Sequence, residues 1–273
     1  MAPQVSVVIP VMNGMPYIKN CVDSILESSR TDLELLISDN ASDDGTAEYL
    51  KTITDNRVKV NHLPKRVSAA ENWTLATRDS TGRYVKLVCA DDLISPEGLD
   101  RQINCALNNP SAKLIASKRS IVDYEGKIIL RSHGLKLLTG AHAGISAITR
   151  SLITGTNQFG EVAAVLFERS ALVSALPWSS EFPYVIDLDM YVKVLKSGSF
   201  VGLDSVDATF RLTPGSWSSE IGNQQAKQFY AWINKVESLH GIKLNFLVKF
   251  SSKVTSKLNM YARRLITSRN SGT

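Results

Sequence analysis

The stretch Tyr84-Val-Lys-Leu-Val-Cys-Ala-Asp91-Asp92 is a short apolar run that ends in two adjacent carboxylates. Neighbouring anions repel each other unless a cation or hydrogen bonds offset their charge, so this ending gives a buried strand no stability of its own. Paired carboxylates at the end of a strand suit a divalent metal that carries a phosphorylated ligand. We therefore interpret the stretch as a strand that leads into a ligand site.

Strand-like and helix-like patterns alternate through the first hundred residues. Apolar runs predict strands at residues 5–9, 33–37, 58–60 and 84–88, and helical patterns fill the segments between and after them. This alternation predicts an α/β fold with a mostly parallel sheet and helices on both faces. Ligands of such sheets bind beyond the carboxyl ends of the strands. Asn13, Asp39 and the pair Asp91-Asp92 follow three of the strands, so we expect them at one edge.

Composition places the chain among globular proteins, with 44% apolar and 21% charged residues over 273 positions. The three cysteines show no CxxC spacing, which argues for a reducing compartment and against a disulfide framework or a zinc ribbon. No basic leader with an apolar run opens the sequence, and no window approaches the roughly 20 apolar residues of a membrane span. These features favour a cytoplasmic location.

The net charge of +5 is unevenly distributed. Residues 225–273 carry nine Lys or Arg against one acid, Glu237, whereas residues 1–224 are mildly acidic. Apolar residues alternate with the basic ones, which fits an amphipathic helix lying on the anionic inner face of a membrane. A helix that packs on the body and exposes a solvated basic face explains the pattern equally well. We expect no nucleic-acid partner, because no binding motif accompanies the charge.

Six stretches, taken in order, resemble family 2 glycosyltransferases of the GT-A fold. They cover roughly residues 4–220 and are Val5–Asn13, Ser38–Thr46, Tyr84–Asp92, Phe159–Ser170, Asp187–Asp189 and Phe210–Ser218. The resemblance implies a GT-A domain over residues 1–222, with a nucleotide-binding half (1–109) and an acceptor-binding half (110–222). A basic helical tail over residues 223–273 follows.

The resemblance also implies an activity. Such enzymes transfer a sugar, with inversion, from a nucleotide-diphosphate sugar, with UDP favoured, to a hydroxyl of the acceptor. A lipid-linked or oligosaccharide acceptor in surface polysaccharide biosynthesis is the expectation. By the same resemblance Asp39 reads the uracil base, Asp91 binds Mn²⁺ or Mg²⁺ with Asp92 beside it, and Asp187 is the catalytic base. Each of these acids also has a purely structural alternative. Asp39 can be a turn acid, and Asp91 and Asp92 can be loop acids ahead of Ser95. Asp187 can be an acid at a helix N-terminus that the helix dipole stabilises.

Five further residues are expected to line the nucleotide-sugar pocket. Pro10, Val11 and Asn13 follow or end the first strand, Asn72 lies in a segment that resembles a base contact, and Arg211 lies near the end of a late strand. A simple turn explains the first three without a ligand, and a capped surface helix explains Asn72.

Three positions depart from the family pattern. Cys89 replaces the first Asp of Asp-Ala-Asp-Asp, Ile186 replaces the Glu before Asp187, and Thr213 stands where Arg-x-His has its His. These departures leave open a non-catalytic partner subunit that binds a nucleotide or a glycan. A sugar nucleotidyltransferase or dinucleotide enzyme has a similar sheet, but the chain has no GxGxxG or basic Gly-rich loop after its first strand.

Overall fold

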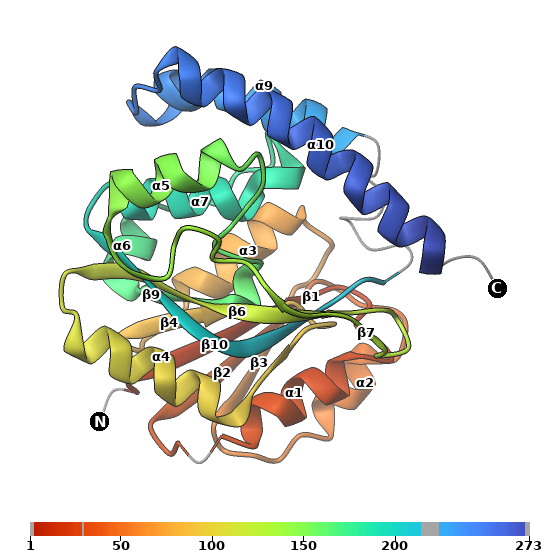
Figure 1. Cartoon of the computed structure of the whole chain (residues 1–273). Coiled ribbons are helices and arrows are strands. Elements are labelled where there is room, and N and C mark those ends of the chain that lie inside the picture. The colour runs from red at the N-terminus through yellow and green to blue at the C-terminus, as the bar shows by residue number, and fades with distance from the viewer. Residues whose placement is uncertain (1–2, 29, 214–223, 271–273) are drawn as a thin grey trace.

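The structure is a computed structural model that describes residues 3–28, 30–213 and 224–270. Within that part of the chain, one ten-stranded sheet carries helices on both faces (Figure 1). The strands follow the order β3-β2-β1-β4-β9-β6-β10-β5, with β7 beside β6 and β8 beside β10. Their bounds are β1 Val5–Val11, β2 Leu33–Asp39, β3 Val58–His62, β4 Tyr84–Leu87, β5 Leu93–Ile94, β6 Ala112–Val122, β7 Ile128–His133, β8 Gly140–Ala143, β9 Val165–Glu168 and β10 Ser199–Arg211.

Each face of the sheet has its own apolar core. Helices α1 (Ile18–Leu26), α2 (Thr46–Lys51) and α4 (Pro96–Asn108) cover one face. The other face is covered by α3 (Ala69–Arg78), α5 (Gly144–Ile153), α6 (Arg169–Ser174), α7 (Ile186–Leu195), α9 (Gln225–His240) and α10 (Phe246–Asn270), with the 3₁₀ turns η1 (Val162–Ala164) and η2 (Pro183–Val185). The buried residues of α1 recur at helical spacing, at positions 18, 21, 22 and 25, which is the pattern of a helix with one apolar face.

The parallel part of the sheet comes from the first four strands. β1 pairs in parallel with β2 and β4, and β2 pairs in parallel with β3. The register places Val11 beside Asp39 and Asp39 beside His62. The carboxyl ends of these strands therefore meet at one edge of the sheet, as the alternation of strands and helices predicted.

The second half of the sheet is mixed. β9 lies antiparallel between β4 and β6, whereas β10 runs parallel to β6. Residues 199–211 form one long strand, β10, with irregularities in register near Leu203 and Val206. Helix α5 begins at Gly144, directly after the residues that form β8 against β10.

The expected end of the first strand at Pro10 is wrong, because β1 continues to Val11. The carbonyl of Val8 accepts a hydrogen bond from the Val88 N–H, and Pro10, two residues further on, faces the same side of the strand. Since β4 ends at Leu87, the missing N–H of Pro10 leaves no ladder bond unmade there.

Helix α9, the first of the two helices after β10, is part of the core on the second face. Its Trp232 is fully buried, and the Trp232 Nε1–H donates a 2.8 Å hydrogen bond to Oδ1 of Asp189 in α7. The predicted domain boundary between residues 222 and 223 lies outside the described residues. Among the helices that the structure describes, none combines the length and the apolar character that a bilayer-crossing segment requires.

Candidate active site

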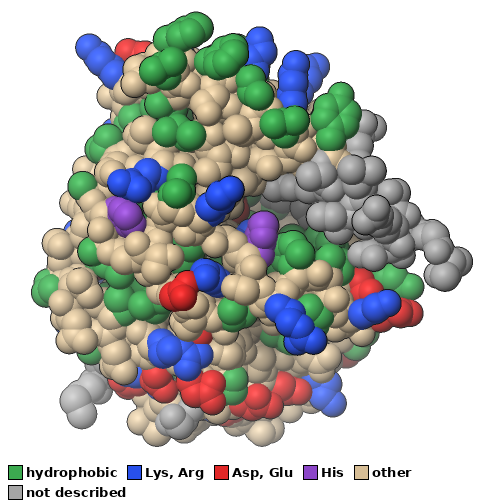
Figure 2. All heavy atoms as spheres, viewed as in Figure 1, with side chains coloured by type: hydrophobic (Ala, Val, Ile, Leu, Met, Phe, Trp, Pro, Cys, Tyr) green, Lys and Arg blue, Asp and Glu red, His purple; other side chains and the backbone are tan. Residues whose placement is uncertain are grey.

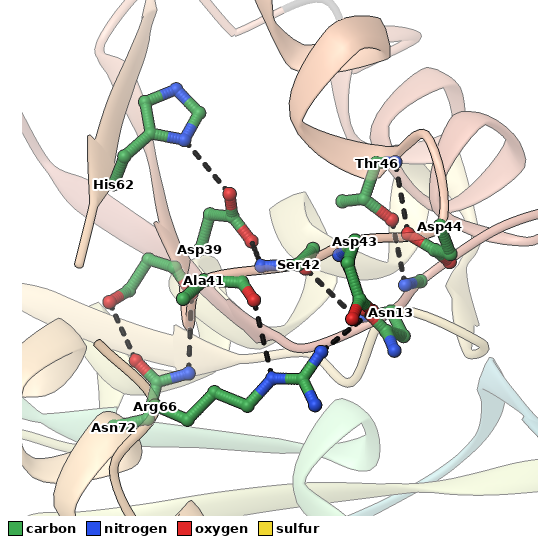
Figure 3. A network of polar contacts seen from close by, with 12 residues as sticks. Asn13, Asp39, Ala41, Ser42, Asp43, Asp44, Thr46, His62, Arg66 and Asn72 are labelled. Carbon is green, nitrogen blue, oxygen red and sulfur yellow. Dashed lines mark hydrogen bonds and ion pairs between the residues drawn. The ribbon is translucent and has the colours of Figure 1, made fainter. Parts of the chain in front are cut away.

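Asp39 ends β2 in a buried polar cluster at the sheet edge (Figure 3). Its carboxylate is 2% exposed. Oδ1 accepts a 3.2 Å hydrogen bond from the Ser42 N–H, and Oδ2 lies 2.9 Å from Nδ1 of His62. Because a carboxylate only accepts, the contact places the imidazole proton on Nδ1. Asp39 is thus an oriented acceptor at the carboxyl edge of the sheet.

Asn13 joins the two loops beside Asp39 (Figure 3). Its backbone lies in the left-handed region, with φ of 56°, a conformation in which Asn is enriched. The Asn13 N–H donates to Oγ of Ser42 at 2.9 Å, and its Oδ1 accepts the Asp43 N–H at 3.0 Å. The side chains of Pro10 and Val11 are buried, so only their backbone can line a pocket at this edge.

Asn72 of α3 is buried against the end of β2 (Figure 3). Its Oδ1 accepts a 2.6 Å hydrogen bond from the Ser38 hydroxyl, and its Nδ2 donates to the Ser38 carbonyl at 3.2 Å. These bonds fix α3 against the sheet directly before Asp39. The predicted contact of Asn72 with a nucleobase stays a prediction.

The acidic pair that follows β4 lies against the end of β10. Oδ2 of Asp91 accepts a 3.0 Å hydrogen bond from the Thr213 hydroxyl, and Oδ1 of Asp92 accepts the Arg211 N–H at 3.1 Å. Burial raises the pKa of Asp91 above its usual value, and the bond from Thr213 opposes this change. Burial, and next the Asp91 charge, raises the pKa of Asp92 well above its usual value. Both carboxylates therefore favour a compensating cation.

Arg211 fixes the backbone around Asp91. Its Nε–H donates to the Asp91 carbonyl at 3.1 Å, and Nη1 donates to the Asp123 carbonyl at 3.3 Å. The guanidinium lies over the ring of Tyr17, 5.0 Å from its centroid. Arg211 thus joins β10, the segment after β4 and the turn between β6 and β7, and it places a positive charge beside the acidic pair.

Asp187 lies half-buried in the first turn of α7. Oδ2 accepts a 2.8 Å hydrogen bond from Nδ2 of Asn157, and Oδ1 accepts the Leu188 N–H at 2.7 Å. Burial, and next the carboxylate of Glu161, raises the pKa of Asp187 to about 7, although the bonds to the carboxylate and the charge of Arg119 act in the opposite direction. A carboxylate with that pKa can accept a proton near neutral pH.

Asp187 shares an electrostatic neighbourhood with the acidic pair. Burial raises the pKa of the Cys89 thiol well above its usual value, and the charges of Asp92, Asp91 and Asp187 raise it further. Glu161 likewise raises the pKa of both Asp92 and Asp187. The structure therefore brings acids from the segment after β4, from the turn before η1 and from α7 to one region.

Sequence reasoning missed four residues of this region: His62, Arg119, Asn157 and Glu161. His62 ends the third strand at the same edge as Asp39, and Arg119 is a buried cation within an apolar strand. The position of each residue in the sequence pattern could therefore have identified it as a candidate. Arg119 Nη2 donates to Oε1 of Glu161 at 3.0 Å. Glu161 lies inside the motif Phe159–Ser170, but its spacing indicated no role, and no local pattern marks Asn157.

A divalent metal fits the acidic pair. Oδ2 of Asp92 is buried and finds no hydrogen-bond partner among the residues that the structure describes. No group of three His, Cys, Asp or Glu gathers around a single point within those residues. Mg²⁺ and Mn²⁺ sites that also use substrate phosphates need only one or two protein carboxylates, so Asp91 and Asp92 match that donor set.

By fold and site, the chain is an α/β protein in which Asp39 ends β2 and the pair Asp91-Asp92 follows β4, beyond the carboxyl ends of its parallel strands. Comparison with protein-family models matches residues 6–171 to the model described as glycosyl transferase family 2. This match spans more than half of the chain. The chain belongs to glycosyl transferase family 2, which confirms the family that the six stretches indicated.

Relatives of known name agree with this assignment. The glycosyltransferase TuaG of Bacillus subtilis (strain 168), whose name assigns it provisionally to teichuronic acid biosynthesis, is 25% identical over 259 residues. That alignment covers 93% of this chain and 97% of TuaG.

Solved structures confirm the GT-A fold. Residues 1–349 of TarS from S. aureus, in complex with UDP-GlcNAc, align with a TM-score of 0.71 and 16% identity, over 95% of this chain and 73% of that one. The mannosyltransferase PcManGT from Pyrobaculum calidifontis, in complex with GDP-Man and Mn²⁺, aligns with a TM-score of 0.64 and 18% identity, over 100% of this chain and 77% of that one. At these identities the likeness concerns the fold.

Proposed function

We propose that the chain is an inverting, metal-dependent glycosyltransferase that moves a sugar from a nucleotide-diphosphate sugar, UDP-linked, to a hydroxyl acceptor. The observation that carries this proposal is Asp187, a carboxylate with a pKa of about 7 held in the same electrostatic neighbourhood as Asp91 and Asp92. An inverting transfer needs one base opposite the leaving group and positive charge beside that group, and both requirements find candidates here.

The reaction assigns a role to each end of the site. Asp187 takes the proton of the acceptor hydroxyl while the hydroxyl oxygen attacks the anomeric carbon. The bond from that carbon to the diphosphate oxygen breaks, and the nucleoside diphosphate leaves with the electron pair. Asn157 holds Asp187 in one orientation through its 2.8 Å bond, so the base is positioned before the acceptor arrives.

Asp91, with Asp92 beside it, would hold Mn²⁺ or Mg²⁺ beside the donor. The bound ion supplies positive charge to the leaving diphosphate. Arg211 adds its charge close by and fixes the backbone of Asp91. The hydroxyl of Thr213, where the family pattern has His, orients the Asp91 carboxylate at 3.0 Å.

We assign base recognition to Asp39, assisted by the backbone of Pro10 and Val11 and by Asn13 and Asn72. An ionised acceptor suits the imide N–H of uracil. The complexes of TarS with UDP-GlcNAc and of PcManGT with GDP-Man support a nucleotide-sugar donor, but their bases differ. The name of TuaG supports a surface polysaccharide as product and a lipid-linked or oligosaccharide acceptor. Three free cysteines in the structure support a cytoplasmic location.

Release of UDP from a panel of UDP-sugars, with GDP-mannose for comparison, tests the proposal in the presence and absence of Mn²⁺. We expect Asp187→Asn to lower the rate of the preferred donor at least about 100-fold, because a general base contributes that much or more. Calorimetric binding of UDP should change little. Asp204→Asn, which alters an acid on β10 paired with Lys118, is the matched control. A rate for Asp187→Asn close to that of the wild type would remove Asp187 as the base.

The departures at Cys89, Ile186 and Thr213 favour a second candidate, a non-catalytic subunit of the same fold that binds a nucleotide or glycan. It predicts that UDP binds while no donor of the panel is cleaved. Mn²⁺-dependent UDP release that Asp187→Asn abolishes would exclude it.

A further inference from the structure

Helix α10 packs one face against the protein and exposes an apolar face on its opposite side. Val248, Ser252 and Ser256 face the protein and are buried, and the Ser252 hydroxyl donates a 2.6 Å hydrogen bond to the Leu152 carbonyl of α5. The opposite face exposes five large apolar side chains at helical spacing. They are Phe246 (77% exposed), Leu247 (72%), Phe250 (56%), Val254 (42%) and Leu258 (62%). We call these five residues the outer face of α10.

Basic residues accompany the outer face. The α10 segment, residues 246–270, contains six Lys or Arg and no Asp or Glu. Lys253 and Lys257 are exposed beside the outer face, and the rings of Phe246 and Phe250 stack with centroids 6.0 Å apart. Figure 2 shows hydrophobic and basic side chains next to one another on the part of the surface that α9 and α10 occupy in Figure 1. Exposed apolar groups rimmed by charge mark interaction surfaces.

We propose that the outer face docks α10 onto an anionic phospholipid bilayer. An amphipathic helix with aromatic and aliphatic residues on one side and lysines at its border lies in the interface of such a membrane. Its positive charge matches the anionic lipids of the cytoplasmic leaflet. A second copy of the chain matches less well, because two-fold pairing of this face would bring two purely basic helices together.

The docked helix is joined to the loop that positions Asp187. Nδ2 of Asn259 donates a 2.8 Å hydrogen bond to the Thr154 carbonyl, and the hydroxyl of Thr255 donates to the Ile153 carbonyl at 3.0 Å. Gly155 lies so close that an added Cβ would collide with the backbone of Ser256. Asn157, two residues further on, bonds Asp187.

Docking of α10 therefore places the bilayer on the same side of the molecule as the loop 154–157, which leads to Asp187. A lipid-linked acceptor would be presented from that side. This last step rests on the proposed function, whereas the docking does not.

Vesicle flotation of the full chain tests the docking without using its activity. We expect the wild type to float with vesicles of phosphatidylglycerol and phosphatidylcholine at low salt, and to float much less with phosphatidylcholine alone or at high salt. The variant Phe246→Ser/Phe250→Ser/Leu258→Ser should lose most of the bound fraction. Leu107→Ser, which changes an exposed apolar residue of α4, should float like the wild type.

A charge variant separates lipid docking from apolar adhesion. Lys253→Gln/Lys257→Gln should weaken binding to the anionic vesicles about 30-fold, because each lysine near such a surface contributes about a factor of five. UDP release by each variant reports on the site separately, so a failed donor assay would not imitate failed docking. Absence of wild-type flotation, or sedimentation showing a dimer that the triple serine variant converts to monomer, would overturn the proposal.

Discussion

The side-chain amide of Asn157 donates a 2.8 Å hydrogen bond to Oδ2 of Asp187, across 30 positions of sequence. This bond stabilises the ionised carboxylate, whereas burial and the charge of Glu161 destabilise it and bring the pKa to about 7. The Leu188 N–H also stabilises the ionised form, and Arg119 of β6, Cys89 after β4 and Tyr191 of α7 interact with Asp187 as well. The balance of these groups decides at which pH the base is available.

The pH dependence of kcat/KM for transfer should show an acid limb near pH 7, since Asp187 must lose its proton to act as a base. Asn157→Ala removes a bond to the ionised form, so the pKa rises and the limb moves to higher pH. Glu161→Gln removes a neighbouring negative charge, so the pKa falls and the limb moves to lower pH. UDP release between about pH 5.5 and 8.5 measures all three profiles.

Opposite shifts distinguish these roles from general damage to the fold. If Asn157→Ala and Glu161→Gln only destabilised the protein, both would lower the activity. They would not shift the acid limb of the pH profile in opposite directions. Asp204→Asn on β10 serves as the control and should leave the limb in place. If the three variants and the wild type share one limb, Asp187 does not titrate in the reaction.

Asp39→Asn should weaken UDP binding about tenfold or more, because the new amide can turn a donor toward the imide N–H of the base, and an unmade buried hydrogen bond costs about 1–3 kcal/mol. Asp43→Asn is the matched control in the same loop, since Asp43 is an exposed acid paired with Arg66. Calorimetry with UDP and Mn²⁺ measures both variants. Equal affinities for Asp39→Asn and Asp43→Asn would mean that Asp39 only supports the turn.

The sheet edge was predictable from sequence because it depends on local patterns. Alternating strands and helices force the carboxyl ends of parallel strands to one edge, so Asp39 and the segment after β4 could be assigned to the same edge without coordinates. The antiparallel insertion of β9 between β4 and β6 was not predictable in this way. β9 pairs with β4, about 80 residues earlier in the sequence. A short apolar run does not indicate with which other strand it pairs.

The surroundings of Asp187 were unpredictable for a related reason. Asn157 and Glu161 come from a loop without regular periodicity, and only tertiary contact brings them to α7. The tail illustrates the same limit. Its basic composition fitted both a helix on a membrane and a helix packed on the body. The buried indole of Trp232, which donates a hydrogen bond to Asp189 43 positions away in the sequence, shows that α9 packs on the body. Composition shows that a segment is basic, and only packing shows which of its faces is covered.

Thr213→Val should weaken Mn²⁺-dependent UDP binding severalfold, because the valine keeps the shape of the side chain but loses the hydroxyl that orients Asp91 at 3.0 Å. Thr213→Ser retains a hydroxyl and should bind like the wild type. Binding of UDP without metal should be similar in all three proteins. Calorimetry with and without Mn²⁺ gives the comparison, and equal metal dependence in the valine variant would contradict a role for Thr213 at Asp91.

Trp232→Phe should lower the free energy of unfolding by about 1–3 kcal/mol, because it keeps most of the buried ring but removes the N–H that Asp189 accepts. Burial opposes ionisation of Asp189, yet the hydrogen bonds from His240 and Trp232 hold its pKa below the usual value. A depressed pKa stabilises the fold above the pKa of an unfolded Asp, about 4, and this contribution is lost as the pH falls through the folded value. The loss of unfolding free energy in Trp232→Phe, measured by urea unfolding, should therefore be larger at pH 7 than in acid.

Tyr230→Phe on the same helix is the control, because it keeps the ring that Lys253 contacts and should change the free energy of unfolding little. A Trp232→Phe protein as stable as this control would show that packing alone holds α9 on α7.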